Sequence, residues 1–137
     1  MPFPFTHELP AVGSTESDSL DFKTEVKPVV GKVSADRFEL AKDVAAFANA
    51  AGGTLLIGAC GGSVLTAFKP IDEATAAWLA REYEEAVRDR CAPPVSIRVE
   101  NIPSGDGVVV AVHVPPFPSP VAVCVAGSAA DGFGGEA

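Results

Sequence analysis

The stretch Ala46-Phe47-Ala48-Asn49-Ala50-Ala51-Gly52-Gly53-Thr54-Leu55-Leu56-Ile57-Gly58 decides the fold, because it predicts where a helix stops and where a buried strand begins. The double glycine suits a helix end, where a left-handed backbone costs glycine little. The residues 54–59 that follow are apolar or small almost without interruption. Such a run predicts a strand that is covered on both faces and lies in the centre of a sheet.

Upstream of this stretch the sequence predicts a helix and, before it, a short strand. The helix begins with Ser34 as N-cap. One apolar stripe runs along it at spacings of three and four residues, formed by Phe38, Ala41, Val44, Ala45 and Ala48. Ser19–Lys23 alternates between apolar and charged residues, which predicts a half-buried strand. Residues 26–33 contain Pro28 and Gly31 and are expected to form a loop.

Downstream, the patterns predict a hairpin strand over 64–68, a second helix over 72–90 capped by Asp72, paired strands over 95–100 and 108–114, and a last strand over 121–125. The buried stripe of the second helix is formed by Ala76, Leu79, Tyr83, Ala86 and Val87. We therefore expect an α+β fold, with two helices packed on a central, mostly antiparallel sheet of five to six strands. Residues 1–13 read as an irregular lead-in, 14–125 as the domain and 126–137 as a Gly/Ala-rich tail.

Composition narrows the class of protein. The 137 residues suffice for one domain, and 18 acidic against 10 basic residues give a net charge of −8, which argues against coating nucleic acid by bulk charge. No apolar run approaches the roughly 20 residues that a membrane helix needs. The three cysteines, Cys60, Cys91 and Cys124, are widely spaced and suit a reducing cytoplasm as small core residues.

Two acidic residues near the amino end are candidate metal ligands. Glu16 and Asp21 lie five positions apart, and Asp21 is expected to point away from the face that holds Leu20 and Phe22. Two carboxylates at one strand edge can hold Mg²⁺ or Mn²⁺, which activates water and neutralises a phosphodiester. The simpler interpretation is a pair of solvated acids at the start of a strand.

Two further patterns bear on nucleic acid. Asn49, Gly52 and Gly53 allow an amide and a closely approaching backbone to meet a phosphate. The simpler interpretation is a helix C-terminus followed by a buried strand, and the dipole at a helix C-terminus repels phosphate. Five basic residues are concentrated within twenty positions and could form a positive face on an acidic molecule: Lys23, Lys27, Lys32, Arg37 and Lys42. The alternative is a solvated loop of mixed charge.

Taken together, these motifs resemble the AlbA-like domain of the Schlafen family. That family shows an acidic residue, a spacing of five, and then acidic-Phe-Lys, which here are Glu16 and Asp21-Phe22-Lys23. It then shows a helix ending Ala-Phe-Ala-Asn-x-x-Gly-Gly and an apolar strand ending Ile-Gly, which here are residues 46–53 and 54–58. The similarity covers about residues 14–125 and is strongest over 16–58.

The resemblance implies a nucleic-acid-associated domain, found in bacteria at the front of transcriptional regulators that are also labelled ATP-binding. Some Schlafen proteins cleave transfer RNA with a metal-dependent site of three acids, and two of these fall on Glu16 and Asp21. Asp21 replaces the more usual Glu and reaches one methylene less far. The third acid is expected just after Ile-Gly, where this chain has Ala59-Cys60-Gly61-Gly62 and no carboxylate.

Three functional hypotheses follow. The leading one is a non-catalytic or weakly catalytic nucleic-acid-binding domain that contacts phosphates through the five basic residues. The second is a Mg²⁺- or Mn²⁺-dependent endoribonuclease that uses Glu16 and Asp21 as catalytic and metal-ligating residues. The third is a protein-interaction or dimerisation module, with an acidic face on the second helix formed by Glu82, Glu84, Glu85 and Asp89. By analogy with the paired lobes of Schlafen cores, a homodimer is expected.

Overall fold

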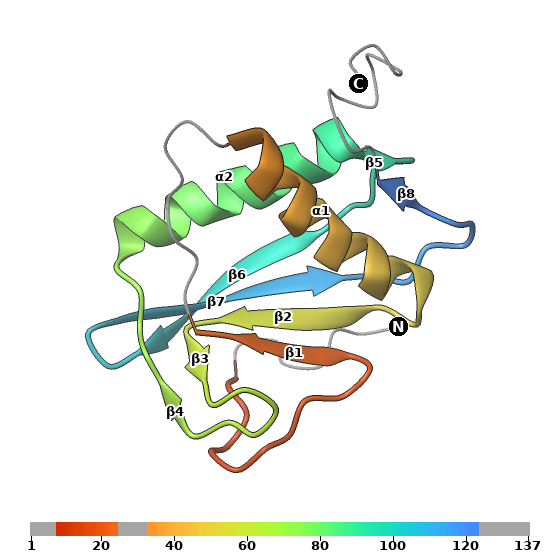
Figure 1. Cartoon of the computed structure of the whole chain (residues 1–137). Coiled ribbons are helices and arrows are strands. Elements are labelled where there is room, and N and C mark those ends of the chain that lie inside the picture. Colours follow the sequence, from red (N-terminus) through yellow and green to blue (C-terminus); the bar gives the residue numbers. More distant parts are fainter. Residues whose placement is uncertain (1–7, 25–32, 124–137) are drawn as a thin grey trace.

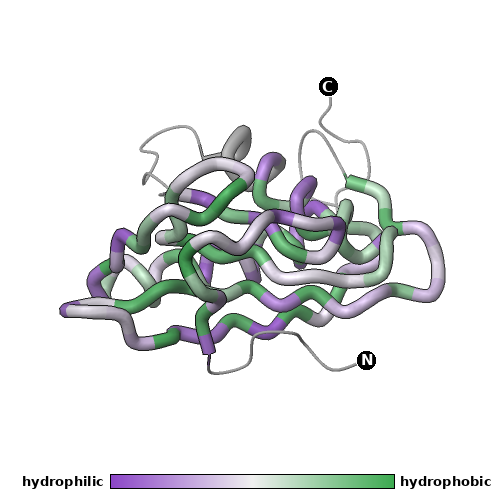
Figure 2. The backbone as a smooth tube through the Cα atoms, turned by 90° about the horizontal axis from the view of Figure 1, so that it is seen from below, coloured by the Kyte–Doolittle hydropathy of each residue, from purple (hydrophilic) through white to green (hydrophobic). Residues whose placement is uncertain are grey.

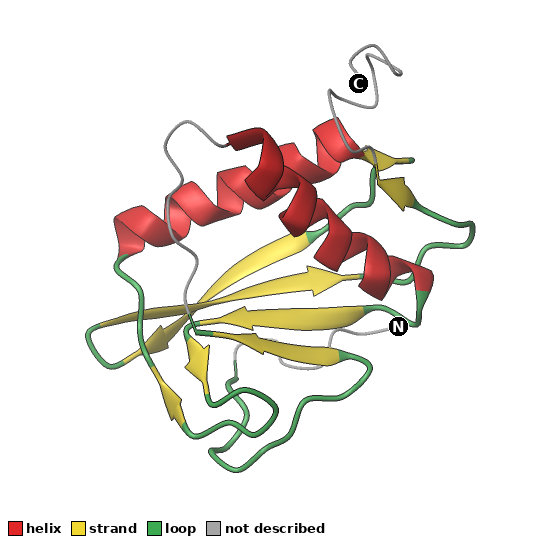
Figure 3. Ribbon diagram, viewed as in Figure 1, coloured by secondary structure: helices red, strands yellow, loops and turns green. Residues whose placement is uncertain are grey.

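The computed structural model describes residues 8–24 and 33–123, with side chains from Glu39 onward in the first helix. The elements follow in the order β1 (Leu20–Lys23), α1 (Val33–Asn49), β2 (Gly53–Ile57), β3 (Ala59–Cys60), β4 (Ala67–Phe68), α2 (Glu73–Arg90), β5 (Cys91–Ala92), β6 (Arg98–Ser104), β7 (Gly107–Val114) and β8 (Ala122–Val123). Both helices lie on the same face of the main sheet, and α1 crosses α2 (Figures 1 and 3). The α+β class expected from the sequence is confirmed.

The main sheet has four strands in the order β1-β2-β7-β6. β1 pairs with β2 in parallel, whereas β2, β7 and β6 pair antiparallel. The expectation of five to six strands in this sheet is corrected, because β3 and β4 form a separate pair. Gly58 is the physical reason: its φ of +105° turns the chain after β2, and a Cβ there would lie 3.0 Å from the Lys69 carbonyl oxygen.

The sheet separates two hydrophobic cores, and hydrophobic and hydrophilic residues alternate along much of the chain (Figure 2). Leu55 and Ile57 of β2 face the helices, and Leu56 faces the other side together with Leu20 and Phe22. All of β2 is buried between β1 and β7, which confirms its central place. Because side chains alternate along a strand, Asp21 and Lys23 of β1 must point toward the helices.

The helices follow their apolar stripes. Every expected stripe residue of α2 is buried, and the Asp72 carboxylate accepts from the Thr75 N–H at 2.9 Å, as expected for the N-cap. In α1, Ala41, Val44, Ala45 and Ala48 are buried, while the Phe38 side chain lies outside the description. The expected N-cap at Ser34 is wrong, because the helix already begins at Val33. Among the residues described, no helix is long and apolar enough to cross a membrane.

The C-terminal half differs from expectation in its strand ends. β6 begins at Arg98 rather than at residue 95, and pairing continues to Ser104 opposite Gly107, so the connection to β7 shrinks to Gly105 and Asp106. Gly105 has a φ of +55°, which suits so tight a turn. Of the strand expected over 121–125, the structure shows β8 (Ala122–Val123), and residues 124 and 125 lie outside the described ranges. β8 pairs with β5, a strand that the sequence did not predict.

Candidate functional site

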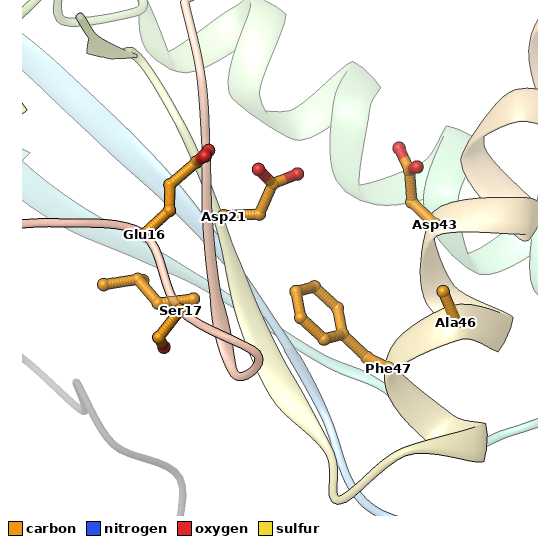
Figure 4. Close-up of a pocket in the computed structure, with 7 residues that line it drawn as sticks. Glu16, Ser17, Asp21, Asp43, Ala46 and Phe47 are labelled. Atoms are coloured by element: carbon orange, nitrogen blue, oxygen red, sulfur yellow. The ribbon is translucent and has the colours of Figure 1, made fainter. Parts of the chain in front are cut away.

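Glu16 and Asp21 lie together at the edge of the sheet, as Figure 4 shows. Glu16 precedes a turn that leads into β1, and its Oε2 accepts from the backbone N–H of Phe22 at 2.9 Å. This bond folds the Glu16 side chain back along β1, and the Asp21 side chain forms a hydrogen bond with it. The two acids are therefore brought together by local chain geometry rather than by a distant contact.

The pKa values of Glu16 and Asp21 are shifted in opposite directions. The hydrogen bond from Asp21, and then the one from the Phe22 N–H, holds the pKa of Glu16 below its ordinary value. Burial, followed by the hydrogen bond and charge of Glu16, raises the pKa of Asp21 to about 6. At pH 7 both groups are therefore mostly ionised, and as the pH falls through 6 Asp21 takes up a proton while Glu16 remains a carboxylate.

A third acid, Asp43 of α1, lines the same pocket. The pocket has a volume of about 230 Å³ and is lined by Glu16, Ser17, Leu20, Asp21, Asp43, Ala46 and Phe47. Asp43 approaches from α1, opposite Asp21, and the Phe47 ring lies below the two acids in Figure 4. Sequence reasoning sought the third acid after Ile57-Gly58. The available signal was that Asp43 and Phe47 flank the apolar stripe of α1, four residues apart and therefore on one side of the helix.

Lys23 forms an ion pair with one of the acids that line this pocket. The Nζ of Lys23 lies 3.2 Å from the Oδ2 of Asp43, so β1 and α1 are joined by an ion pair. Among the residues that the structure describes, no three His, Cys, Asp or Glu side chains come together closely enough to hold a metal ion. With Asp21 bonded to Glu16 and Lys23 on Asp43, the residues present do not fit a resident Mg²⁺ or Mn²⁺.

The five basic residues expected to contact phosphate are only partly placed. Lys23 is half-buried on Asp43, and the exposed Lys42 lies 3.3 Å from Glu39 on the outer side of α1. Lys27 and Lys32 lie outside the described residues, and the side chain of Arg37 is not described either. Lys23 and Lys42 thus come from neighbouring elements, and the chain between β1 and α1 carries two further cations.

The Asn-x-x-Gly-Gly motif acts within the fold. The Asn49 amide donates to the Val121 carbonyl oxygen at 3.0 Å, and its oxygen accepts from the Val121 N–H at 2.8 Å. Gly52 has a φ of +83°, and a Cβ on Gly53 would lie 2.4 Å from the Phe47 ring. Through these two bonds to the backbone of residue 121, Asn49 joins the end of α1 to the chain that precedes β8.

A second polar cluster lies on the opposite face of the sheet, where sequence reasoning proposed nothing. His113 of β7 is completely buried. Its Nδ1 is 3.0 Å from the Thr54 hydroxyl and its Nε2 is 3.0 Å from Oε1 of Glu100. A neutral ring with its proton on Nε2 donates to Glu100 and accepts from Thr54, so both nitrogens are satisfied. Arg98 adds a cation 3.9 Å from the same carboxylate oxygen.

The acidic face expected on α2 is less exposed than its sequence pattern indicates. Glu84 is exposed, whereas Glu82, Glu85 and Asp89 are half-buried and each makes a polar contact. Of the cysteines within the described ranges, Cys91 is buried and Cys60 half-buried, and both are free thiols. Cys124 lies beyond residue 123.

Comparison with known proteins assigns the family. The model of the family described as Schlafen, AlbA_2 matches residues 16–131, which is most of the chain. The protein therefore belongs to the Schlafen AlbA_2 family, as the motifs indicated. No curated protein matches the chain at a significant level.

Solved structures were also compared with the chain, and the DIP2311 protein is among those that match. The DIP2311 protein of Corynebacterium diphtheriae is 21% identical, with a TM-score of 0.43. The match covers 76% of this chain but only 19% of that protein, so this chain corresponds to a small part of it.

Proposed function

We propose that this domain binds nucleic acid through phosphate contacts made by the basic residues of β1, of α1 and of the segment between them. The observation that carries the proposal is the family assignment over residues 16–131. The ion pair between Lys23 and Asp43 supports it, because it fixes the end of β1 against α1 and so brings two cation-bearing elements side by side. Phosphate contacts of this kind position a domain without reading bases.

The charge of the molecule sets the strength and salt dependence of this binding. With a net charge of −8, the domain repels phosphate except where the cations gather, so we expect weak binding that is visible only at low salt. The pocket lined by Glu16, Asp21 and Asp43 lies beside β1, and its negative charges repel phosphate. Contacts are therefore expected on the outer side of Lys23 and along the exposed flank of α1.

The test is a titration of the whole chain against short RNA and DNA duplexes at low salt. Lys23→Glu and Lys42→Glu should weaken binding, and each lost contact should reduce the salt slope by about 1. Arg81→Glu makes the same charge change on the exposed side of α2 and is the matched control. Absence of binding at tens of micromolar protein, or equal losses in all three variants, would overturn the proposal.

A second candidate, a metal-dependent endoribonuclease, is favoured by one observation: Asp43 lines the pocket of Glu16 and Asp21, so three carboxylates are present after all. It ranks second because these acids do not fit a metal ion as they are arranged. Incubation of transfer RNA with Mn²⁺, with wild type and Glu16→Ala compared, tests it. RNA that survives equally with and without the protein would reject the enzyme hypothesis.

A further inference from the structure

The two edges of the main sheet, β1 and β6 in Figure 1, differ in how their outward-facing backbone groups are bonded. At the β1 edge, the chain that precedes the strand covers these groups. Leu20 exchanges two backbone hydrogen bonds with Ser17, at 3.0 and 3.3 Å. The Phe22 N–H donates to the Glu16 carboxylate at 2.9 Å. A further strand cannot add to this edge without displacing these contacts.

The outward-facing groups of β6 follow from the bonding of its neighbour β7. Val108 of β7 directs its N–H and its carbonyl oxygen to Ile71, at 2.9 and 2.7 Å, and therefore away from β6. Because bonding alternates along an antiparallel pair, β6 bonds to β7 through its even-numbered residues. The odd-numbered residues of β6 direct their backbone groups away from the sheet, and these are Val99, Asn101 and Pro103.

This outer edge of β6 is open to a further strand. Within residues 8–24 and 33–123, no backbone group bonds to the outward side of Val99 or Asn101. Asn101 is exposed, and Val99 and the preceding Ile97 are half-buried apolar residues beside the core under the helices. Outward N–H and C=O groups next to partly covered apolar side chains are a template for another strand. Pro103 has no N–H and therefore ends the stretch that can pair.

The residues of β6 favour a second copy of the same strand as its partner. In an antiparallel pair with two-fold symmetry, one residue faces its own copy and defines the alignment. Alignment on Arg98 or on Glu100 places like charges opposite each other, which is destabilising. Alignment on Asn101 or beyond places Pro103, which lacks a donor, at a bonding position. Alignment on Val99 avoids both and places Arg98 of each copy opposite Glu100 of the other.

We propose that two copies of this chain pair through the outer edges of β6, in antiparallel alignment on Val99. The two copies of Val99 exchange backbone hydrogen bonds, and Ile97 of each copy pairs with Asn101 of the other. Arg98 and Glu100 of opposite copies form a non-hydrogen-bonded pair, in which side chains lie closest together. The four-stranded sheets of both copies then form one continuous sheet, with the helices of both copies on the same face.

The dimer is expected to be weak and reversible. It depends on one short strand from each copy, and each copy carries a net charge of −8, so the two copies repel each other at long range. The interface lies at the opposite edge of the sheet from β1 and Lys23, and is therefore separate from the phosphate contacts proposed above.

Sedimentation equilibrium of the whole chain, from micromolar to submillimolar concentration, measures the association. Asn101→Pro removes an N–H that does not bond to β7 and should abolish the dimer. Arg98→Glu places carboxylates opposite each other on both sides of the symmetry axis and should raise the dissociation constant about tenfold. Lys42→Glu makes the same charge change on the outer side of α1 and should leave the dissociation constant unchanged. Circular dichroism checks that each variant is folded.

Two cysteine variants test the alignment and do not depend on the folding of Asn101→Pro. Under mild oxidation Val99→Cys should give a disulfide-linked dimer, because the two copies of residue 99 lie opposite each other within disulfide reach. Asn101→Cys should not, because its two copies are offset by about 13 Å along the strands. Wild type has three cysteines of its own and provides the background of cross-linking.

Four results would overturn the proposal. They are a chain that stays monomeric throughout, a dimer that persists in a folded Asn101→Pro protein, equal effects of Arg98→Glu and Lys42→Glu, and cross-linking of Val99→Cys no greater than that of Asn101→Cys. No nucleic acid is present in these experiments, so a monomeric result leaves the proposed phosphate binding intact.

Discussion

The two faces of the main sheet carry two polar clusters that differ in how completely their groups are hydrogen-bonded and neutralised. On one face the buried His113 is hydrogen-bonded to the buried Thr54 and to the half-buried Glu100, so each ring nitrogen of the histidine has a partner. On the other face, within the part of the chain that the structure describes, three carboxyl groups line one pocket beside Lys23, and the Tyr83 hydroxyl in the core of that face has no hydrogen-bond partner. A fully hydrogen-bonded cluster stabilises the fold, whereas neighbouring like charges and a buried hydroxyl without a partner lower its stability.

The difference makes opposite predictions for side-chain removal. Removing a group from the satisfied cluster should destabilise the protein, because its partners remain buried and unbonded. Removing the charge of Asp21 or the hydroxyl of Tyr83 should leave the protein as stable or make it more stable, because the first change relieves repulsion between carboxylates and the second deprives no partner. The following variants test this contrast through the free energy of unfolding.

The largest effect is expected from His113→Ala. It leaves the Glu100 carboxylate, whose side chain is 10% exposed, without the imidazole and opens a cavity beside Thr54. We expect a loss of about 3 kcal/mol, because a buried charge loses its hydrogen-bond partner. Urea denaturation measures it, with Asp18→Asn as an exposed control that should change stability by less than about 0.5 kcal/mol. A loss below about 1 kcal/mol would show that Arg98 alone satisfies Glu100.

Asn49→Ala should come next. It deletes both hydrogen bonds between the end of α1 and Val121, and leaves the backbone N–H of Val121 without its acceptor. A loss of about 2 kcal/mol is expected from two hydrogen bonds that span much of the chain. Chemical denaturation again gives the value, and Asn101→Ala, at an exposed position of β6, provides the control. Equal stability of the two variants would contradict a structural role for the motif.

Asp21→Asn should act in the opposite direction and depend on pH. The pKa of Asp21 in the folded protein is raised to about 6, so the folded state binds its proton more tightly than the unfolded state. The stability that this proton contributes is complete below the unfolded pKa and is lost as the pH rises through 6. Asparagine keeps a donor for Glu16 at every pH.

At pH 8 the Asp21→Asn variant should therefore be about 1 kcal/mol more stable than wild type, and the gain should vanish near pH 4. Denaturation at several pH values measures the gain, and an NMR titration of the Asp21 carboxyl carbon measures the pKa directly. Glu16 has a lowered pKa and contributes with the opposite sign, so its own loss of charge appears only at lower pH. A gain independent of pH would refute the shared proton.

Tyr83→Phe should give the smallest effect. Because the hydroxyl is buried without a partner, its removal should leave stability unchanged or raise it by about 0.5 to 1 kcal/mol. Thermal unfolding at fixed pH measures the change. A destabilised Tyr83→Phe protein would show that the hydroxyl has a bonding role in the fold and would erase the contrast between the two faces.

Much of the fold could be read from the sequence because its main elements are set by local periodicity. The stripe of α2, the cap at Asp72 and the buried run of β2 follow from spacing alone. The division of the strands into one sheet and two pairs does not, because it depends on a single backbone angle at Gly58 and on the distant pairing of β5 with β8.

Only some residues of the candidate site could be predicted from the sequence. Glu16 and Asp21 are close in the chain, so their spacing reveals them. Asp43 comes from α1, which lies on one face of the sheet, and the ion pair between Lys23 of β1 and Asp43 shows how close the two elements lie. The ion pair between Lys23 and Asp43 was also unpredictable, because the sequence does not show that α1 lies beside β1.

The contact between Phe47 and Gly53 has a consequence for selectivity. The ring occupies the volume that a Cβ on residue 53 would need, so it packs against the backbone of a fully buried strand. Because the backbone of β2 lies behind it, the Phe47 ring has little space to move away from a large ligand. We therefore expect the pocket to select ligands by size and shape, with little change in its own conformation.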